Sequence, residues 1–178
     1  MNRIDWDTMW MTTAFIFSQR SVDESTKHGC VFVDENNKLI SMGYNSYPRD
    51  CEDNKLPQTR PEKYKITIHS ETNAIINATR SLEGSTVYVT GYPCSPCFSN
   101  MLNAGVKKII YGPVGSNCLD EMDIDLVRKM NISKKTGENK IEIIKFQDFN
   151  NIKNIEKFMD KTKEYMYDKS KLTNLING

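Results

Sequence analysis

The chain has 178 residues, of which 38% are hydrophobic, 26% charged and 10% aromatic, and this is ordinary for one globular domain. The composition excludes disordered, collagen-like and membrane-spanning proteins. The net charge is +1, so no overall field would draw the protein to a nucleic acid or to an acidic membrane. Residues 1–127 carry 12 basic and 16 acidic side chains, whereas residues 128–178 carry 12 and 7, which leaves a basic C-terminal part.

Helices and strands alternate along the predicted chain. The expected elements are a helix over 7–20, a hairpin of strands 30–34 and 39–44, a long polar loop over 45–66, a helix over 69–82, a strand over 86–91, a helix over 95–104, a strand over 106–111, a helix near 119–130, a strand at 140–146 and a Lys/Glu-rich helix near 150–168. This order predicts an α/β layer architecture with parallel strand pairs. No internal repeat is present, so we expect one domain over 1–178.

The N-terminal residues lack the basic and apolar regions of a secretion signal, and no apolar stretch is long enough to span a membrane. Five cysteines stand at irregular spacing, namely Cys30, Cys51, Cys94, Cys97 and Cys118. Without a secretion signal, they do not predict a disulfide framework. We therefore expect a cytoplasmic protein, with Cys30 and Cys118 as small buried or bystander residues and Cys51 unassigned.

Two helix starts carry residues that bind metals. His69 and Glu71 open one expected helix, and Cys94 and Cys97 open the next within the run Pro-Cys-Ser-Pro-Cys. Thiolates and imidazoles are the preferred zinc ligands, and two cysteines at i and i+3 lie on one face of a helical turn. The helix N-terminus also favours the thiolate that binds metal. We therefore predict a zinc site of His69, Cys94 and Cys97.

Three protein ligands with an open position are typical of a catalytic zinc site rather than a structural one. In such a site, zinc lowers the pKa of a bound water to about 7, and a proton carrier is then needed. Glu71 is the predicted carrier. Alone, Cys-x-x-Cys could equally be a redox pair or an incidental pair, but the combination H-x-E…P-C-x-x-C is typical of zinc nucleobase deaminases.

With these motifs, the sequence resembles the cytidine deaminase-like superfamily and most closely the deoxycytidylate (dCMP) deaminases. The similar segments, in order, are 20–21 after a Trp-containing helix, 25–29 before the first strand, Gly-Tyr-Asn at 43–45, 69–75 and 104–109. The resemblance covers about residues 5–113, while 114–178 is divergent and lysine-rich. It implies a three-layer α/β/α sandwich around a mixed five-stranded sheet.

The resemblance also implies hydrolytic deamination of dCMP to dUMP with release of ammonia, one Zn²⁺ per subunit, and a homo-oligomer that is often a hexamer. Many members respond to Mg²⁺-dCTP as an effector. Two residues of this chain depart from the pattern, because Ser46 replaces a usual glycine and His28 replaces an apolar residue. These departures leave open whether nucleotide control is inherited.

Two further residues are substrate-side candidates. The resemblance places Asn45 beside the substrate, and its amide can donate to and accept from a nucleoside, although it could instead form a turn. Lys27, before the first strand, is a candidate for the 5′-phosphate, or else a solvated lysine. Asn73 belongs to the segment after Glu71 that recurs in dCMP deaminases, but its side chain could equally support the neighbouring loop.

Two other functions compete with a nucleotide deaminase. A base deaminase acting on tRNA or single-stranded nucleic acid uses the same chemistry, and the basic C-terminal part favours it, but the near-neutral charge and the lack of interleaved basic and aromatic residues disfavour it. A non-enzymatic zinc module would need a fourth ligand and would leave Glu71 unused. Finally, a continuous helix would turn Arg80 away from the site, where it could contact another subunit or remain solvated.

Overall fold

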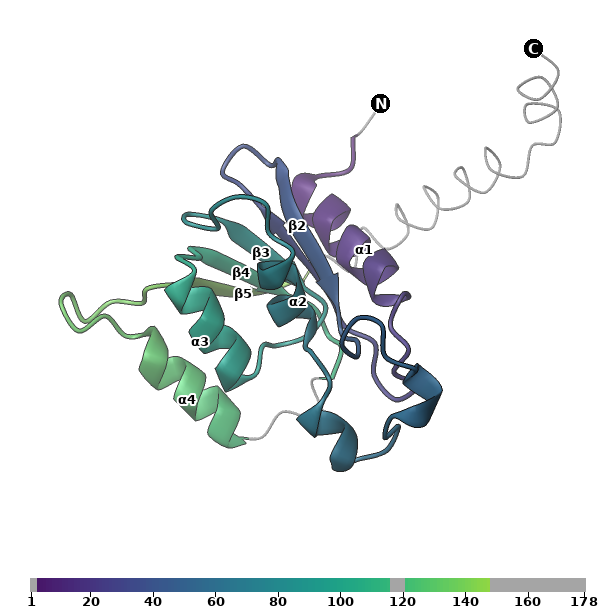
Figure 1. The fold of residues 1–178 in the computed structure, drawn as a ribbon. Helices are drawn as coiled ribbons and strands as arrows, with labels where there is room; N and C mark the ends of the chain where they lie inside the picture. Colours follow the sequence, from purple (N-terminus) through teal and green to yellow (C-terminus); the bar gives the residue numbers. More distant parts are fainter. Residues whose placement is uncertain (1–2, 116–120, 148–178) are drawn as a thin grey trace, which may run out of the picture.

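The computed structural model describes residues 3–115 and 121–147 (Figure 1). Its elements are the helices α1 (Trp6–Ser18), α2 (Ser70–Ile76), α3 (Ser95–Asn103) and α4 (Glu121–Asn131), the strands β1 (Gly29–Val33), β2 (Leu39–Tyr44), β3 (Thr86–Val89), β4 (Lys108–Tyr111) and β5 (Glu142–Lys145), and two 3₁₀ turns at Asp53–Lys55 and Glu62–Lys65. Cys118 and the expected helix near 150–168 lie outside the described residues.

The five strands form one sheet in the order β2-β1-β3-β4-β5. β1 pairs antiparallel with β2 and with β3, whereas β3, β4 and β5 run parallel to one another. The sheet is therefore mixed, as the resemblance implied. The parallel half follows from the alternation of strands with helices that the sequence indicated.

Helices cover both faces of this sheet (Figure 1). One buried cluster joins the sheet to α2, α3 and α4, and a second joins its other face to α1. Central members of the first cluster are Phe32, Val87, Phe98, Met101 and Ile109, and those of the second are Met11, Val31, Val33, Tyr88 and Ile110. Alternate residues of β1 and β3 enter opposite clusters, as the two-residue period of a strand requires. The result is the predicted three-layer α/β/α sandwich.

A close backbone contact sets the position of α2 on the sheet. A Cβ atom at Gly43 of β2 would lie 2.2 Å from the carbonyl oxygen of Ser70 and 2.4 Å from the amide nitrogen of Ala74. Any side chain at residue 43 would therefore push α2 outward. Since α2 begins directly after His69, this glycine also determines how close His69 lies to the sheet edge.

The expected helix over 69–82 is shorter than predicted. α2 ends at Ile76, and Asn77 is its C-cap. The following Asn, Thr and Ser residues compete with helical hydrogen bonding through their side chains, and the chain turns so that Leu82 reaches the core with 6% exposure. The continuous helix assumed for Arg80 was therefore wrong. Arg80 forms an ion pair of 3.0 Å with Asp34 of the same chain.

The segment after residue 113 adds a layer helix and the last strand. α4 packs beside α3, and β5 pairs with β4 in parallel. Val127 and Ile141 from this segment are 0% and 1% exposed within the first core cluster. The divergent part of the sequence therefore continues the same fold through residue 147. Within the described residues, no helix is both long and apolar enough to cross a membrane.

Candidate metal centre and substrate cavity

The candidate metal ligands meet at one edge of the sheet because two helices begin there. His69 is the N-cap residue of α2 and Cys94 is the N-cap residue of α3. Both have extended backbone conformation, with φ of −69° and ψ of 155° and 162°. β3 leads directly into the turn before Cys94, so the carboxyl end of a parallel strand delivers this ligand.

The three predicted ligands converge. Nδ1 of His69 lies 3.4 Å from Sγ of Cys94 and 3.4 Å from Sγ of Cys97, and all three ligand atoms lie within 4.8 Å of one another. A tetrahedral zinc ion bonded to sulfur at about 2.3 Å and to nitrogen at about 2.0 Å would separate these atoms by about 3.5 Å. The arrangement and its soft donor set therefore fit zinc.

The same three groups shift one another's protonation. A hydrogen bond to Cys94 raises the pKa of His69 to about 9, against the lowering effect of burial. Hydrogen bonds from Cys97 and from His69 lower the pKa of Cys94 to about 5, although burial opposes them. Cys97 shifts the other way, since its hydrogen bond to Cys94 and its burial raise its pKa. Without metal, the cluster at pH 7 is thus a thiolate beside an imidazolium and a thiol.

Glu71 lies beside this cluster on the first turn of α2. Its side chain is buried, with 6% exposure, and its carboxylate contributes to the raised pKa of His69. The hydroxyl of Ser70 donates a hydrogen bond of 2.8 Å to Oε2 of Glu71. This contact holds one carboxylate oxygen, and the group lies adjacent to the candidate ligands.

A carboxylate from α4 supports the start of α3. Oδ1 of Asp123 accepts a hydrogen bond of 2.9 Å from the backbone N–H of Ser95. Ser95 is the first residue of α3, and the side chain of Cys94 provides no capping bond. The sequence analysis missed Asp123 because it lies in the segment that could not be matched to the resembled family. An acidic residue has no sequence signal for capping a different helix.

A cavity of about 530 Å³ opens over these residues. Its lining residues are Asp23, Thr26, His28, Asn45, Arg60, Lys63, Tyr64, Thr67, His69, Ser70, Glu71, Gly91, Tyr92, Cys94, Ser95, Pro96, Val114, Gly115 and Asp123. Its size is in the range of small-molecule sites. The long loop after β2 forms one wall, and the ends of β3 and β4 form another.

Asn45 lies in this cavity wall, and its amide is bound to the backbone of the segment before β1. Oδ1 of Asn45 accepts from the N–H of His28 at 2.7 Å, and Nδ2 donates to the carbonyl of Thr26 at 3.0 Å. The side chain therefore connects two chain segments, and one hydrogen of Nδ2 and one lone pair of Oδ1 remain for a ligand. Asn73 supports the loop, since it donates to the carbonyl of Tyr44 and to the hydroxyl of Ser46.

Lys27 is half-buried and is not among the residues that line the cavity, although its neighbours Thr26 and His28 are. The lysine and arginine side chains in the lining are those of Lys63 and Arg60. Neither was singled out from the sequence, because they belong to a polar loop without periodicity. Of the other cysteines, Cys30 is buried in β1, as expected, and Cys51 is exposed.

The comparisons with known proteins point to a zinc-binding family. Residues 4–113 match the family model described as "Cytidine and deoxycytidylate deaminase zinc-binding region". The human deoxycytidylate deaminase is 34% identical over 115 residues, which are 61% of this chain and 65% of the relative. The mouse enzyme is 35% identical over 115 residues, which are again 61% of this chain and 65% of the relative. The alignments thus span slightly less than two thirds of these curated relatives.

Among solved structures, the dCMP deaminase of cyanophage S-TIM5 in complex with dCMP and dUMP is similar to this chain. Its TM-score is 0.62 at 25% sequence identity, and the match covers 82% of this chain and 100% of that one. The RibD protein of Acinetobacter baumannii has a similar fold, with a TM-score of 0.53 at 22% identity over 79% of this chain and 35% of that protein.

Proposed function

We propose, on the premise that this chain belongs to the cytidine and deoxycytidylate deaminase zinc-binding family, that it deaminates dCMP hydrolytically to dUMP and ammonia. The observation that carries the proposal is the convergence of His69, Cys94 and Cys97 beside the buried Glu71 at a cavity of nucleotide size. The relatives named deoxycytidylate deaminase, and the S-TIM5 complex with dCMP and dUMP, support the choice of substrate.

One Zn²⁺ per subunit would be held by His69, Cys94 and Cys97. When bound, zinc supplies a Lewis acid that lowers the pKa of a water at its open position to about 7. The family is defined by a zinc-binding region, and the donor set of this chain fits that ion. The N-cap positions of His69 and Cys94 place both residues at the starts of α2 and α3, where their ligand atoms converge.

Glu71 would move the protons of the reaction. The carboxylate of Glu71 can take one proton from the attacking water and pass it to N3 of the pyrimidine, and it can later move the proton of the added hydroxyl to the departing amino group, which leaves as ammonia. Its burial keeps bulk water from competing for these transfers, and Ser70 fixes the orientation of its Oε2 atom. Such a positioned acid and base typically contributes 10²- to 10⁴-fold to a rate.

Substrate binding would use Asn45 on the sugar side of the nucleotide. The amide has one donor and one acceptor position left after its bonds to Thr26 and His28, and both can pair with a deoxyribose hydroxyl or ring group. For the 5′-phosphate, Lys27 stays a candidate from the sequence, but Arg60 lies in the cavity lining. The guanidinium of Arg60 lies 5.5 Å from the ring centre of Tyr64, and its planar donors suit a phosphate.

The domain organisation, the oligomeric state and the effector response of this protein are also proposals. Residues 1–178 would form one deaminase domain, which the continuation of the sheet into β5 supports. A homo-oligomer such as a hexamer, and an effector role for Mg²⁺-dCTP, rest on the resemblance of the sequence to dCMP deaminases. Light scattering and assays with added nucleotide would test these two properties directly.

A base deaminase acting on nucleic acid is the less favoured alternative. Capture of a strand needs several cationic and aromatic side chains along one groove. Within the described residues, the lysine and arginine side chains that line the cavity are Lys63 and Arg60, and the ammonium of Lys63 is bound to Asp23. The cavity is therefore equipped for one phosphate rather than for a chain of phosphates.

A deamination assay of the zinc-loaded full chain tests the proposal. We expect turnover of dCMP and much lower efficiency with deoxycytidine, CMP and a cytosine-containing oligonucleotide. Contact with a single phosphate should give only a shallow dependence of KM on salt, whereas contact with several backbone phosphates would make affinity fall steeply. Efficient deamination of the oligonucleotide, with dCMP inert, would overturn the proposal.

A further inference from the structure

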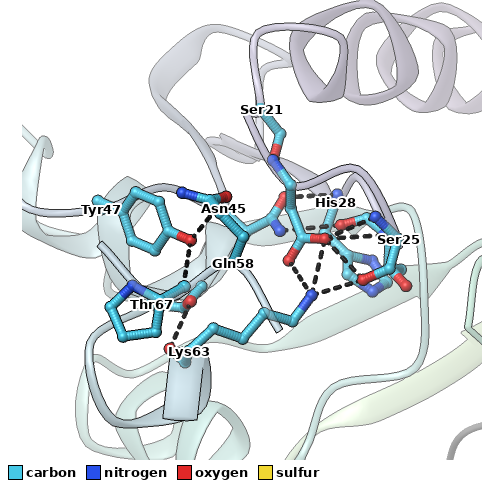
Figure 2. A network of polar contacts seen from close by, with 11 residues as sticks. Ser21, Ser25, His28, Asn45, Tyr47, Gln58, Lys63 and Thr67 are labelled. Atoms are coloured by element: carbon cyan, nitrogen blue, oxygen red, sulfur yellow. Dashed lines mark hydrogen bonds and ion pairs between the residues drawn. The ribbon is translucent and has the colours of Figure 1, made fainter. Parts of the chain in front are cut away.

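A buried lysine lies in the loop that forms one wall of the cavity. Lys63 is 3% exposed, and lysines are rarely so buried unless they are paired. Its ammonium donates to both carboxylate oxygens of Asp23 at 2.9 Å and also to the hydroxyl of Ser25 (Figure 2). These three bonds use the three N–H donors of the ammonium group. Lys63 is thus engaged within the protein and has no donor left for a phosphate.

On the other side of the ion pair, Asp23 organises the turn that precedes β1. Its Oδ1 accepts hydrogen bonds from the backbone N–H groups of Ser25 at 2.9 Å and Thr26 at 3.1 Å. Burial by itself raises the pKa of Asp23, but the bonds from Lys63, Ser25 and Thr26 outweigh burial and lower this pKa to about 2. The carboxylate is therefore charged at neutral pH, and the ion pair is present under assay conditions.

The same turn holds Asn45. The carbonyl of Thr26 accepts from Nδ2 of Asn45, and the N–H of His28 donates to its Oδ1. Figure 2 shows this continuous polar path from Lys63 to Asn45 and His28. A change at Lys63 would therefore be transmitted through Asp23 and Thr26 to a residue of the cavity wall.

Lys63 also sets the position of its own loop. Its carbonyl accepts from both the N–H and the hydroxyl of Thr67, at 2.9 and 2.8 Å. Arg60, Tyr64 and Thr67 flank it in the cavity lining. The loop is closed at its base by the bridge between Ser46 and Ile68. The ion pair of Lys63 and Asp23 is thus a second attachment of this loop, and it binds the loop to the segment before β1.

We propose that the ion pair of Lys63 and Asp23 is a positioning device for the nucleotide. It joins the loop of residues 46–68, which carries Arg60, to the segment 23–28, which binds the amide of Asn45, and so it fixes the position of Arg60 relative to Asn45. Lys63 is a positioning residue that does not touch the substrate. The inference rests on the proposed function, because the spacing of Arg60 and Asn45 matters for a ligand that contacts both residues, as a nucleotide with a sugar and a phosphate does.

The test compares K63M, D23N and the double variant D23N/K63M with K55M. Lys55 is a matched control, since it belongs to the same loop and pairs with Glu52 at 2.6 Å, but with 71% of its side chain exposed. For each full-length, zinc-loaded protein, KM and kcat for dCMP, the zinc content and the midpoint of thermal unfolding are measured. Calorimetric binding of dUMP gives a second readout that needs no turnover.

We expect K63M and D23N to raise KM and the dUMP dissociation constant about tenfold or more, with kcat within about threefold of wild type and zinc content unchanged. For K55M, KM and the dUMP dissociation constant should both stay within about twofold of the wild-type values. The double variant should be no worse than either single variant, because the two residues act as a unit. If K63M fails to fold, the KM and dUMP affinity of D23N/K63M provide the test instead. The double variant removes both charges, so it leaves no buried charge unpaired.

Lower thermal stability with an unchanged KM and unchanged dUMP binding would show that the ion pair only stabilises the fold and would overturn the inference. Multiplying effects in the double variant would overturn it as well. These results are distinct from failure of the proposed function, in which the wild-type protein itself does not deaminate dCMP. In that case the dUMP arm still decides whether the pair positions a nucleotide.

Discussion

The backbone N–H of Ser95 donates a hydrogen bond of 2.9 Å to the carboxylate of Asp123, so a residue of α4 caps the helix that begins with two candidate metal ligands. The first N–H groups of a helix have no partner within the helix. A negative charge is also favourable at a helix N-terminus. Asp123 therefore stabilises the first turn of α3, which contains Cys94 and Cys97. It does so from a position 28 residues after Ser95 in the sequence.

Replacing Asp123 should weaken zinc binding. D123A removes the acceptor for Ser95, so the first turn of α3 loses its cap and the two thiols are less well oriented. We expect the zinc dissociation constant, measured by competition with a chelator, to rise about 10- to 100-fold. D125A is the control, since Asp125 is on the same helix but pairs with Lys129 on the surface. Equal zinc affinity for D123A and wild type would contradict this role.

E71Q should retain zinc and lose nearly all turnover. The amide can still occupy the place of the carboxylate beside Ser70, but it cannot carry protons to N3 or to the departing ammonia. Zinc analysis and kcat on the same sample separate the two effects, and C94A is the reference variant that should lose zinc itself. A kcat above about a tenth of wild type, which corresponds to less than about 1.4 kcal/mol of barrier, would exclude Glu71 as the proton carrier.

Zinc binding should release protons and become stronger as pH rises. In the metal-free protein, the pKa of His69 is raised to about 9, so its imidazole is protonated at pH 7. The pKa of Cys97 is also raised, whereas that of Cys94 is lowered to about 5, so Cys94 is already a thiolate. Metal ligands must be deprotonated. Binding at pH 7 should therefore displace about two protons, and the apparent affinity should rise about 100-fold per pH unit between about pH 6 and 8.

Calorimetry in buffers of different ionisation enthalpy counts these protons directly. A value near two at pH 7 agrees with the thiolate and imidazolium arrangement of the metal-free cluster. Uptake or release of no protons would mean that His69 and Cys97 are both deprotonated before zinc arrives.

R80E should leave the mass of the species that the protein forms in solution unchanged. The guanidinium of Arg80 is bound to Asp34 and to the carbonyls of Lys38 and Leu39 in its own chain. Charge reversal places two carboxylates side by side and should lower the unfolding midpoint slightly, while D34R/R80E should recover it. Light scattering that shows a smaller species for R80E would instead return Arg80 to a subunit interface.

The sequence by itself predicted the residues of the candidate metal centre. His69, Glu71, Cys94 and Cys97 were found because each pair lies within one helical turn, where spacing alone sets the relative positions of the side chains. The alternation of elements likewise predicted the layers and the parallel half of the sheet. These features depend on residues close together in the chain, so periodicity and capping suffice to predict them.

Only the tertiary structure decided which residues surround that centre. Asp123 caps α3 from α4, and Lys63 is buried against Asp23, 40 residues away. Arg80 was misplaced for the same reason, because the end of α2 depends on Leu82 turning back into the core. For a lysine, an arginine or an aspartate on a loop or helix surface, the sequence contains no periodic pattern that identifies its partner. Its burial and its ion pair arise only when packing brings distant segments together and the charge must then be matched.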